Sequence, residues 1–182
     1  GNSEVGQNTL GTGRVNMQSL VRIDRAIQDW SLFDHELLHV MCARAKTAKR
    51  PVHLLGLVSD GWVHSHIQHL FALITFFTKQ NTPFVVHAIT DGRDTDPYSG
   101  KWFIEQLLQK LEGTTGKLVS VIGRYYAMAR DSRRERVERA MQLYFEKQWN
   151  ETTDILSTIQ QNYDAGITDE FLDPIRSGND ND

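Results

Sequence analysis

The stretch LLGLVSDGWVHSHIQHL, residues 54–70, decides the fold of this chain. An apolar run, Leu54–Val58, is followed by a polar loop, Ser59–His64, and then by an amphipathic segment that begins at Ser65. This order predicts a strand, a loop and a helix, the unit on which open α/β sheets place sites at the carboxyl ends of their strands. The stretch also contains three histidines that could ligate a metal together: His64, His66 and His69.

The same unit occurs three times along the chain. We predict strands over residues 52–58, 84–89 and 118–122, and following helices over residues 65–79, 99–111 and 132–148. Capping-box patterns mark two helix starts, Ser65 with Gln68 and Ser132 with Glu135. Successive units of this kind form parallel sheets with right-handed crossovers, and near-continuous apolar strands indicate that both faces are covered. We therefore expect an α/β fold of three α/β/α layers, with a mostly parallel sheet and helices on both faces.

The remaining segments flank these units. Residues 1–13 contain four glycines among small polar residues, which favours a loop. Apolar spacing predicts helices over residues 18–30 and from about residue 34 to Pro51, and a last helix over residues 151–163.

Composition narrows the class of protein. The 182 residues suit one domain, and 40% hydrophobic with 24% charged residues is ordinary for a globular protein. A net charge of −3 argues against a general nucleic-acid binder, and no apolar run approaches the roughly 20 residues of a membrane helix. We therefore expect neither a membrane nor a nucleic-acid partner. The single cysteine, Cys42, fits a reducing compartment, so we expect a cytoplasmic protein. The start on Gly1 and the polar end suggest a piece of a longer protein.

The three loops that follow the predicted strands meet at one edge of a parallel sheet. They read SDGWVH (59–64), TDGRDTDP (90–97) and GRYYAMARD (123–131). Three arginines and a histidine near helix starts favour an anion, either phosphate or carboxylate, and aspartates can orient the arginines or accept a proton. The residues brought to this rim are Asp60, His64, Arg93, Asp94, Arg124 and Arg130.

Several of these features have simpler interpretations. The dipeptides Asp60-Gly61 and Asp91-Gly92 are common in turns, and the metal interpretation of the histidines lacks a clear further ligand. Ser3, in a glycine-rich turn, could be a nucleophile, although composition alone favours an ordinary loop serine. Four arginines alternate with glutamates, so we expect most of them on a solvated helical face with local ion pairs: Arg133, Arg134, Arg136 and Arg139.

Six motifs in series carry a resemblance to a known family. They are GNSEVG (1–6), LGTGR (10–14), SDGWVHSHIQHL (59–70), DGRDTDP (91–97), GRYYAMARD (123–131) and GITDEF (166–171). In this order they resemble the cofactor-independent (2,3-bisphosphoglycerate-independent) phosphoglycerate mutases. The resemblance implies an alkaline-phosphatase-like domain with two Mn²⁺ or Mg²⁺ ions and an inserted phosphotransferase domain. It assigns residues 1–16 to a nucleophile-bearing loop and hinge of the first domain, residues 17–175 to the phosphotransferase domain and residues 176–182 to a flexible tail.

The resemblance also implies roles for individual residues. Ser3 would be the catalytic serine that carries the phosphoryl group, and it would contact the metals only with ligands from the absent domain. Substrate would be bound by His64, Arg93, Asp94, Arg124 and Arg130, with Asp94 also the catalytic general base. The implied reaction interconverts 3-phosphoglycerate and 2-phosphoglycerate in glycolysis and gluconeogenesis, in a monomer, through a phosphoserine intermediate.

The chain departs from the family pattern at four positions: Gln7 in place of His, Trp62 in place of Gly, Asp96 in place of Pro and Ala129 in place of Asp. The family's metal ligands and a later pair of substrate arginines have no counterpart in this chain, so we expect it to be inactive by itself. Two competing hypotheses are a non-catalytic module that binds phosphoglycerate or another small anion, and a metal-dependent hydrolase that uses the histidines between residues 64 and 69.

Overall fold

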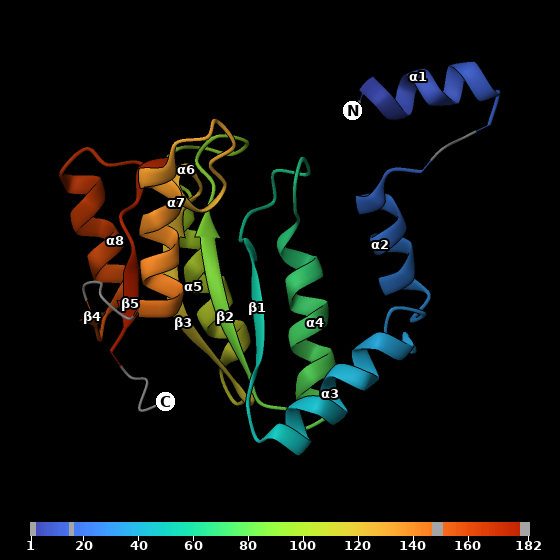
Figure 1. The fold of residues 1–182 in the computed structure, drawn as a ribbon, viewed down its shortest axis with the longest axis horizontal. Coiled ribbons are helices and arrows are strands. Elements are labelled where there is room, and N and C mark those ends of the chain that lie inside the picture. The colour runs from blue at the N-terminus through green and yellow to red at the C-terminus, as the bar shows by residue number, and fades with distance from the viewer. Residues whose placement is uncertain (1–2, 15–16, 147–150, 179–182) are drawn as a thin grey trace.

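The structure, a computed structural model, describes residues 3–14, 17–146 and 151–178, without the side chains of residues 3 and 4 (Figure 1). Its centre is a five-stranded sheet with the order β1-β2-β3-β5-β4. The first three strands pair in parallel, β5 is antiparallel to β3, and β4 is parallel to β5. Their bounds are β1 (Val52–Leu57), β2 (Phe84–Thr90), β3 (Gly116–Gly123), β4 (Glu151–Thr152) and β5 (Ile175–Ser177). The prediction of a mostly parallel sheet is confirmed.

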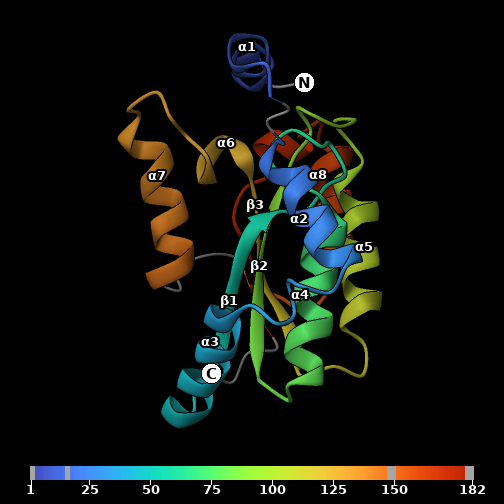
Figure 2. The same cartoon turned by 90° about the vertical axis from the view of Figure 1, so that its right-hand side faces the viewer.

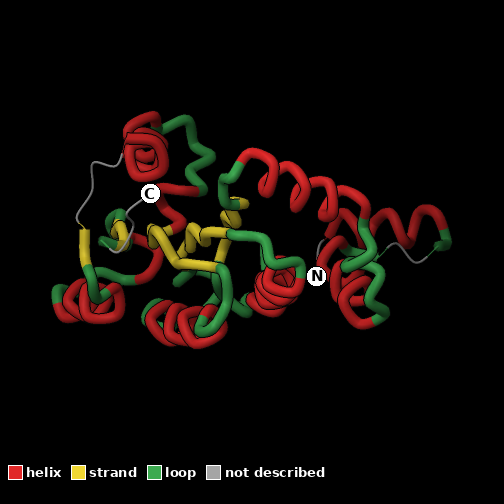
Figure 3. Tube along the Cα trace, turned by 90° about the horizontal axis from the view of Figure 1, so that it is seen from below, coloured by secondary structure: helices red, strands yellow, loops and turns green. Residues whose placement is uncertain are grey.

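Helices cover both faces of this sheet. One face carries α4 (Ile67–Lys79), α5 (Gly100–Leu111) and α8 (Ile155–Asp164), and the other carries α7 (Arg134–Met141) with the π-helix η1 (Gln142–Glu146) (Figures 1 and 2). Viewed from below, the strands lie between the two helical layers (Figure 3). The three-layer α/β/α architecture expected from the sequence is therefore confirmed.

Two apolar clusters hold these layers together. The larger lies under α4, α5 and α8 and includes Phe77, Ile104 and Ile159, which are fully buried. The smaller lies under α7 and η1, where Ala140 and Leu143 contact the ends of the strands. Burial of each large apolar side chain stabilises the fold by roughly 1.5–3 kcal/mol, so the two clusters hold the strands in place.

The prediction that every strand is covered on both faces is wrong for β1. Strand β2 is buried along almost its whole length, but β1 leaves His53, Leu55 and Gly56 exposed. The second helical layer reaches β1 only at Leu57, because α7 and η1 lie over β2 and β3. An edge strand that is covered on one face alone exposes its alternate side chains.

The N-terminal region also differs from its prediction. Residues 3–12 form helix α1 (Ser3–Thr12) rather than a loop, and Gly13 ends the helix with a φ of 65°. Glycine within a helix costs only about 1 kcal/mol relative to alanine, and here the hydroxyl of Thr9 donates to the carbonyl of Val5 at 2.8 Å. Figure 1 shows α1 apart from the sheet, before α2 (Ser19–Gln28) and α3 (Glu36–Ala48). The helices predicted over residues 18–30 and 34–51 are confirmed.

The C-terminal segment is ordered further than predicted. The expected tail begins at residue 176, but Arg176 and Ser177 belong to β5, where they extend the sheet beyond β3. The backbone N–H of Gly178 donates to Thr152 at 2.8 Å, so pairing with β4 stabilises this end. Residues 179–182 lie outside the described part of the chain.

Both predicted capping boxes are wrong in detail. The N-cap of α4 is His66, whose Nδ1 accepts the Gln68 N–H at 3.2 Å, while the Ser65 hydroxyl donates to Leu57 O at 3.0 Å. Ser132 has a φ of 59°, and α7 begins after Arg133 without a side-chain cap. In the parts of the chain that the structure describes, no helix has the length and apolarity needed to cross a lipid bilayer.

Candidate functional site

The three loops predicted to meet do so, at the carboxyl ends of β1, β2 and β3. Together with the 3₁₀-helix η2 (Asp169–Phe171) and the start of α7, they line a cavity of about 390 Å³. All five residues predicted to bind substrate are in its wall, whereas Asp60 is not. The lining residues are His64, Arg93, Asp94, Arg124, Tyr125, Met128, Ala129, Arg130, Asp131, Arg136 and Glu170.

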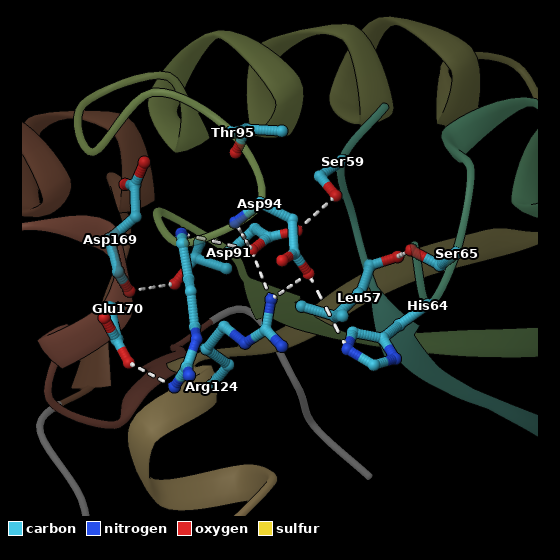
Figure 4. Close-up of polar contacts among 12 residues, drawn as sticks. Leu57, Ser59, His64, Ser65, Asp91, Asp94, Thr95, Arg124, Asp169 and Glu170 are labelled. Carbon is cyan, nitrogen blue, oxygen red and sulfur yellow. Dashed lines mark hydrogen bonds and ion pairs between the residues drawn. The ribbon is translucent and has the colours of Figure 1, made fainter. Parts of the chain in front are cut away.

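Arg124 is the most deeply placed cation in this wall. It is the first residue of α6 (Arg124–Ala127), directly after β3, and its side chain is 9% exposed. One of its terminal nitrogens donates to both Asp91 Oδ1 at 2.5 Å and Asp94 Oδ2 at 2.6 Å (Figure 4). Burial by itself would lower the pKa of Arg124, but the hydrogen bonds to Asp94 and Asp91 outweigh burial and raise it. The guanidinium is therefore charged and fixed in direction.

Asp91 belongs in the sequence to a dipeptide that is common in turns. The structure buries it to 3% exposure beneath the cavity, where it accepts hydrogen bonds from the N–H groups of Arg93 and Asp94 and from the Ser59 hydroxyl. Although burial raises the pKa of a carboxyl group, these hydrogen bonds and the one from Arg124 hold the pKa of Asp91 below its usual value. The available signal was an aspartate directly after an apolar strand.

Asp94 faces the cavity from above Arg124. Its Oδ2 lies 3.8 Å from His64 Nε2, and the Asp94 side chain is 18% exposed against 48% for His64. Gly61 packs closely on Asp94, since a Cβ at Gly61 would lie 3.0 Å from the Cβ of Asp94. Among the described residues, Asp94 Oδ1 has no hydrogen-bond partner, so one carboxylate oxygen is available to a ligand.

Arg93 and Arg130 are the exposed cations of the cavity. Arg93 is held only loosely, with one of its terminal nitrogens 3.8 Å from Glu170 Oε1. Arg130 makes no ion pair within the described part of the chain. Both guanidinium groups can therefore turn toward an anion that enters from solvent.

Glu170 belongs to the GITDEF motif, and sequence reasoning assigns it no role. Its neighbour Asp169 is fully buried and ties η2 to the start of α5 and to α8, because it accepts from the Gly100 N–H at 2.7 Å and from the Tyr163 hydroxyl. Burial raises the pKa of Asp169 to about 6, against the opposing effect of the Tyr163 hydrogen bond. These contacts fix Glu170 opposite Arg93.

Arg136 is the exception among the four arginines, most of which were expected on a solvated face. Its side chain is 16% exposed, bonds Asp131 Oδ2 at 3.0 Å and lies 3.8 Å from the centre of the Tyr125 ring. Arg134, by contrast, is 89% exposed. The helix begins at Arg134, so its first turn presents Arg136 toward α6 rather than toward solvent.

The two other histidines considered as metal ligands have partners outside this wall. His66 caps α4, and His69 Nε2 contacts Asp24 Oδ1 at 2.9 Å, so each has a local partner. In residues 3–14, 17–146 and 151–178, no group of three or more His, Cys, Asp or Glu side chains could hold a metal. Ser3 starts α1, but its side chain lies outside the described residues, and the structure does not place the predicted nucleophile relative to the cavity.

Comparison with known proteins identifies the family. The family model "BPG-independent PGAM N-terminus" matches residues 23–182. The chain belongs to this family. A relative from Bacteroides thetaiotaomicron, a 2,3-bisphosphoglycerate-independent phosphoglycerate mutase, is 46% identical over 98% of this chain and 36% of its own length. The mutase of the same name from Caenorhabditis elegans is also 46% identical, over 96% of this chain and 33% of its own length.

A solved structure agrees with the family assignment. The Leishmania mexicana phosphoglycerate mutase, crystallised at low cobalt concentration, superposes with a TM-score of 0.86 at 29% identity. The match covers 97% of this chain and 34% of that protein. The chain thus spans about a third of the length of the relatives that it matches, and the family resemblance inferred from the motifs is confirmed.

Proposed function

We propose that this chain is the phosphoglycerate-binding part of a 2,3-bisphosphoglycerate-independent phosphoglycerate mutase, which interconverts 3-phosphoglycerate and 2-phosphoglycerate. One observation carries the proposal: in a member of this family, arginines from two loops and a helix converge on one cavity at the carboxyl edge of the sheet. Arginine suits phosphate and carboxylate because its planar fork can donate two parallel hydrogen bonds.

The exposure of the cavity residues suggests different roles in binding the ligand. Arg93 and Arg130 are exposed and would bind the phosphate and carboxylate of the ligand directly. Arg124 is held by two carboxylates and would present its remaining N–H groups in a fixed direction. Asp94, whose Oδ1 is available, would accept a hydroxyl proton from the glycerate, beside His64.

The charge balance of the wall predicts weak binding by this chain alone. Of the described lining residues, four are arginines, while Asp94, Asp131 and Glu170 are acidic, and Asp91 adds a buried negative charge below them. The wall is therefore close to neutral, whereas phosphoglycerate carries several negative charges. We infer that further cations come from the part of the mutase that this chain does not span.

The remainder of the mutase would also hold the metal ions that act with Ser3. We propose that Ser3 carries the phosphoryl group as a phosphoserine and that two Mn²⁺ or Mg²⁺ ions are held by an alkaline-phosphatase-like remainder of the protein. A serine oxygen suits these hard cations, and Ser3 would contact them together with ligands from the remainder of the protein. When bound, such ions would stabilise negative charge on the phosphoryl oxygens. We further propose a cytoplasmic monomer, consistent with the free, buried Cys42.

A chimera tests the function. Residues 1–182 replace the matched third of the B. thetaiotaomicron mutase, and ³¹P NMR follows conversion of 3-phosphoglycerate in the presence of Mn²⁺. We expect turnover that is lost with Ser3→Ala, while Ser19→Ala serves as the matched control. A chimera that folds but leaves 3-phosphoglycerate unchanged would refute the mutase proposal.

The alternative is a non-catalytic module that binds phosphoglycerate or another small anion. Calorimetric titration of the 182-residue chain with 3-phosphoglycerate separates the two, because a binding module requires tight binding without the rest of a mutase. Weak binding by the chain combined with an active chimera supports the enzyme, whereas tight binding with an inactive chimera supports the module.

A further inference from the structure

We propose that Asp91 is a positioning residue for this site, which fixes the Arg124 guanidinium and the backbone of Arg93 and Asp94 in one arrangement. The inference rests on the proposed function, because it assigns a role beneath the same cavity. Asp91 does not line the cavity, so it would act through the residues that it holds and not by touching the ligand.

Every polar contact of Asp91 leads to a loop of the site. Its Oδ1 accepts from the N–H of Arg93 at 3.2 Å, the N–H of Asp94 at 3.0 Å and Arg124 at 2.5 Å (Figure 4). Its Oδ2 accepts from the Ser59 hydroxyl at 2.7 Å. One carboxylate thus connects the ends of all three parallel strands, since Ser59 follows β1, Asp91 follows β2 and Arg124 follows β3.

The arrangement above Asp91 depends on these bonds. Without the Asp91 oxygens, the bonded nitrogen of Arg124 keeps only Asp94 as a carboxylate partner and can follow it. The N–H groups of Arg93 and Asp94 would also lose their acceptor, so the turn that aims both side chains into the cavity would no longer be fixed. A buried ion pair is weak evidence for stability alone, and here its geometry converges on the site.

Two substitutions separate position from charge. In Asp91→Asn the remaining oxygen can still accept the three bonds made by Oδ1, and the Ser59 hydroxyl can rotate to accept from the amide. Asp91→Ala removes all four bonds. A positioning role therefore predicts that the asparagine variant retains most of the function, whereas a role of the negative charge predicts that both variants fail alike.

A control variant and a milder variant complete the set. Asp173→Ala breaks another Arg–Asp pair, with Arg139 at 2.7 Å, away from the cavity. Ser59→Ala leaves the carboxylate in place and removes only the bond to Oδ2. Thermal unfolding of each variant reports whether it is folded at the assay temperature.

The readouts are kcat and KM for 3-phosphoglycerate in the chimera. We expect kcat/KM to fall about tenfold or more in Asp91→Ala and by about two- to fivefold in Ser59→Ala, with Asp91→Asn within about threefold of the parent. Asp173→Ala should match the parent. If Asp91→Ala does not fold, Ser59→Ala and Asp91→Asn decide, and an unchanged kcat/KM in Ser59→Ala overturns the inference.

Failure of this inference differs from failure of the proposed function. If the parent chimera is active and the folded Asp91→Ala variant equals it, or if Asp91→Asn is as impaired as Asp91→Ala, only the positioning role is wrong. If the parent chimera neither binds nor converts 3-phosphoglycerate, the proposed function is wrong and the role of Asp91 falls with it.

Discussion

Asp169 should make the stability of this chain depend on pH in an unusual direction. Burial raises its folded-state pKa to about 6 from an ordinary value of 3.8. Between these two values the folded state holds the proton more tightly than the unfolded state, so the free energy of unfolding falls as pH rises. The contribution is full below the unfolded value and lost once the pH has passed the folded value. Most carboxylates with lowered pKa values, such as Asp91, act in the opposite direction.

The size of this effect follows from the shift. A difference of about two units, at about 1.4 kcal/mol per unit, makes folding about 3 kcal/mol less favourable at pH 7 than at pH 3.5 through this one group. Asp169→Asn cannot ionise, and its amide oxygen can still accept the Gly100 N–H, which preserves the bond to the start of α5. Relative to the parent, the variant should therefore gain about 3 kcal/mol between those pH values.

Urea unfolding followed by circular dichroism measures this difference. The free energy of unfolding is determined for parent and variant at half-unit steps from pH 3.5 to 7, so that groups without an interaction with Asp169 cancel in the difference. Asp173→Asn, an aspartate with a half-exposed side chain in the same segment, provides the baseline for an Asp-to-Asn exchange. A difference between parent and Asp169→Asn that stays constant across this range would refute the argument that burial of Asp169 opposes its ionisation.

Three further substitutions test the site and the core. Arg124→Met leaves Asp91 buried without its cation, so the free energy of unfolding measured in urea should fall by about 3–5 kcal/mol. A decrease of less than about 1 kcal/mol would contradict the burial of this ion pair. Glu170→Gln removes the acidic neighbour of Arg93 and should tighten 3-phosphoglycerate binding about two- to fivefold by calorimetry, with a smaller gain at high salt because Arg93 is exposed. Phe77→Ala, at a fully buried position of α4, should destabilise the chain by about 3–5 kcal/mol. It should leave the kcat/KM of a folded chimera unchanged, and a change in KM would show that the core is coupled to the site.

The layout of the site could be predicted because parallel strands have one direction. Three apolar runs, each followed by a polar loop and a helix, are enough to place His64, Arg93 and Arg124 at one edge. The resemblance to the family then selected His64 from the histidines of the first unit. Cavity position confirms that these residues lie together, whereas their roles in binding and catalysis remain predictions.

The residues that sequence reasoning missed depend on contacts between distant segments. Asp91 resembles any turn aspartate until Ser59 and Arg124 are known to approach it, across separations of 32 and 33 residues. Arg136 resembles its exposed neighbours until the start of α7 and its approach to Tyr125 are known. Local patterns report the face of a helix but not which other element covers that face.

Buried carboxylates explain how polar loops form a defined site. The Asp91 carboxylate connects the ends of the three parallel strands, and the Asp169 carboxylate connects η2 to the start of α5 by accepting from the Gly100 N–H at 2.7 Å. Neither carboxylate lines the cavity, yet a residue that does line it follows each of them closely in the sequence, Asp94 after Asp91 and Glu170 after Asp169. The wall is thus held from behind by acidic groups that do not line the cavity, and Arg93, Arg130 and one oxygen of Asp94 remain available to a ligand.

This division predicts that substitutions behind the wall alter the geometry of binding, whereas substitutions of the lining cations alter its dependence on salt. Comparing the salt dependence of 3-phosphoglycerate binding in Asp91→Ala and Arg130→Gln would separate the two, because only the second removes a charge that the ligand contacts.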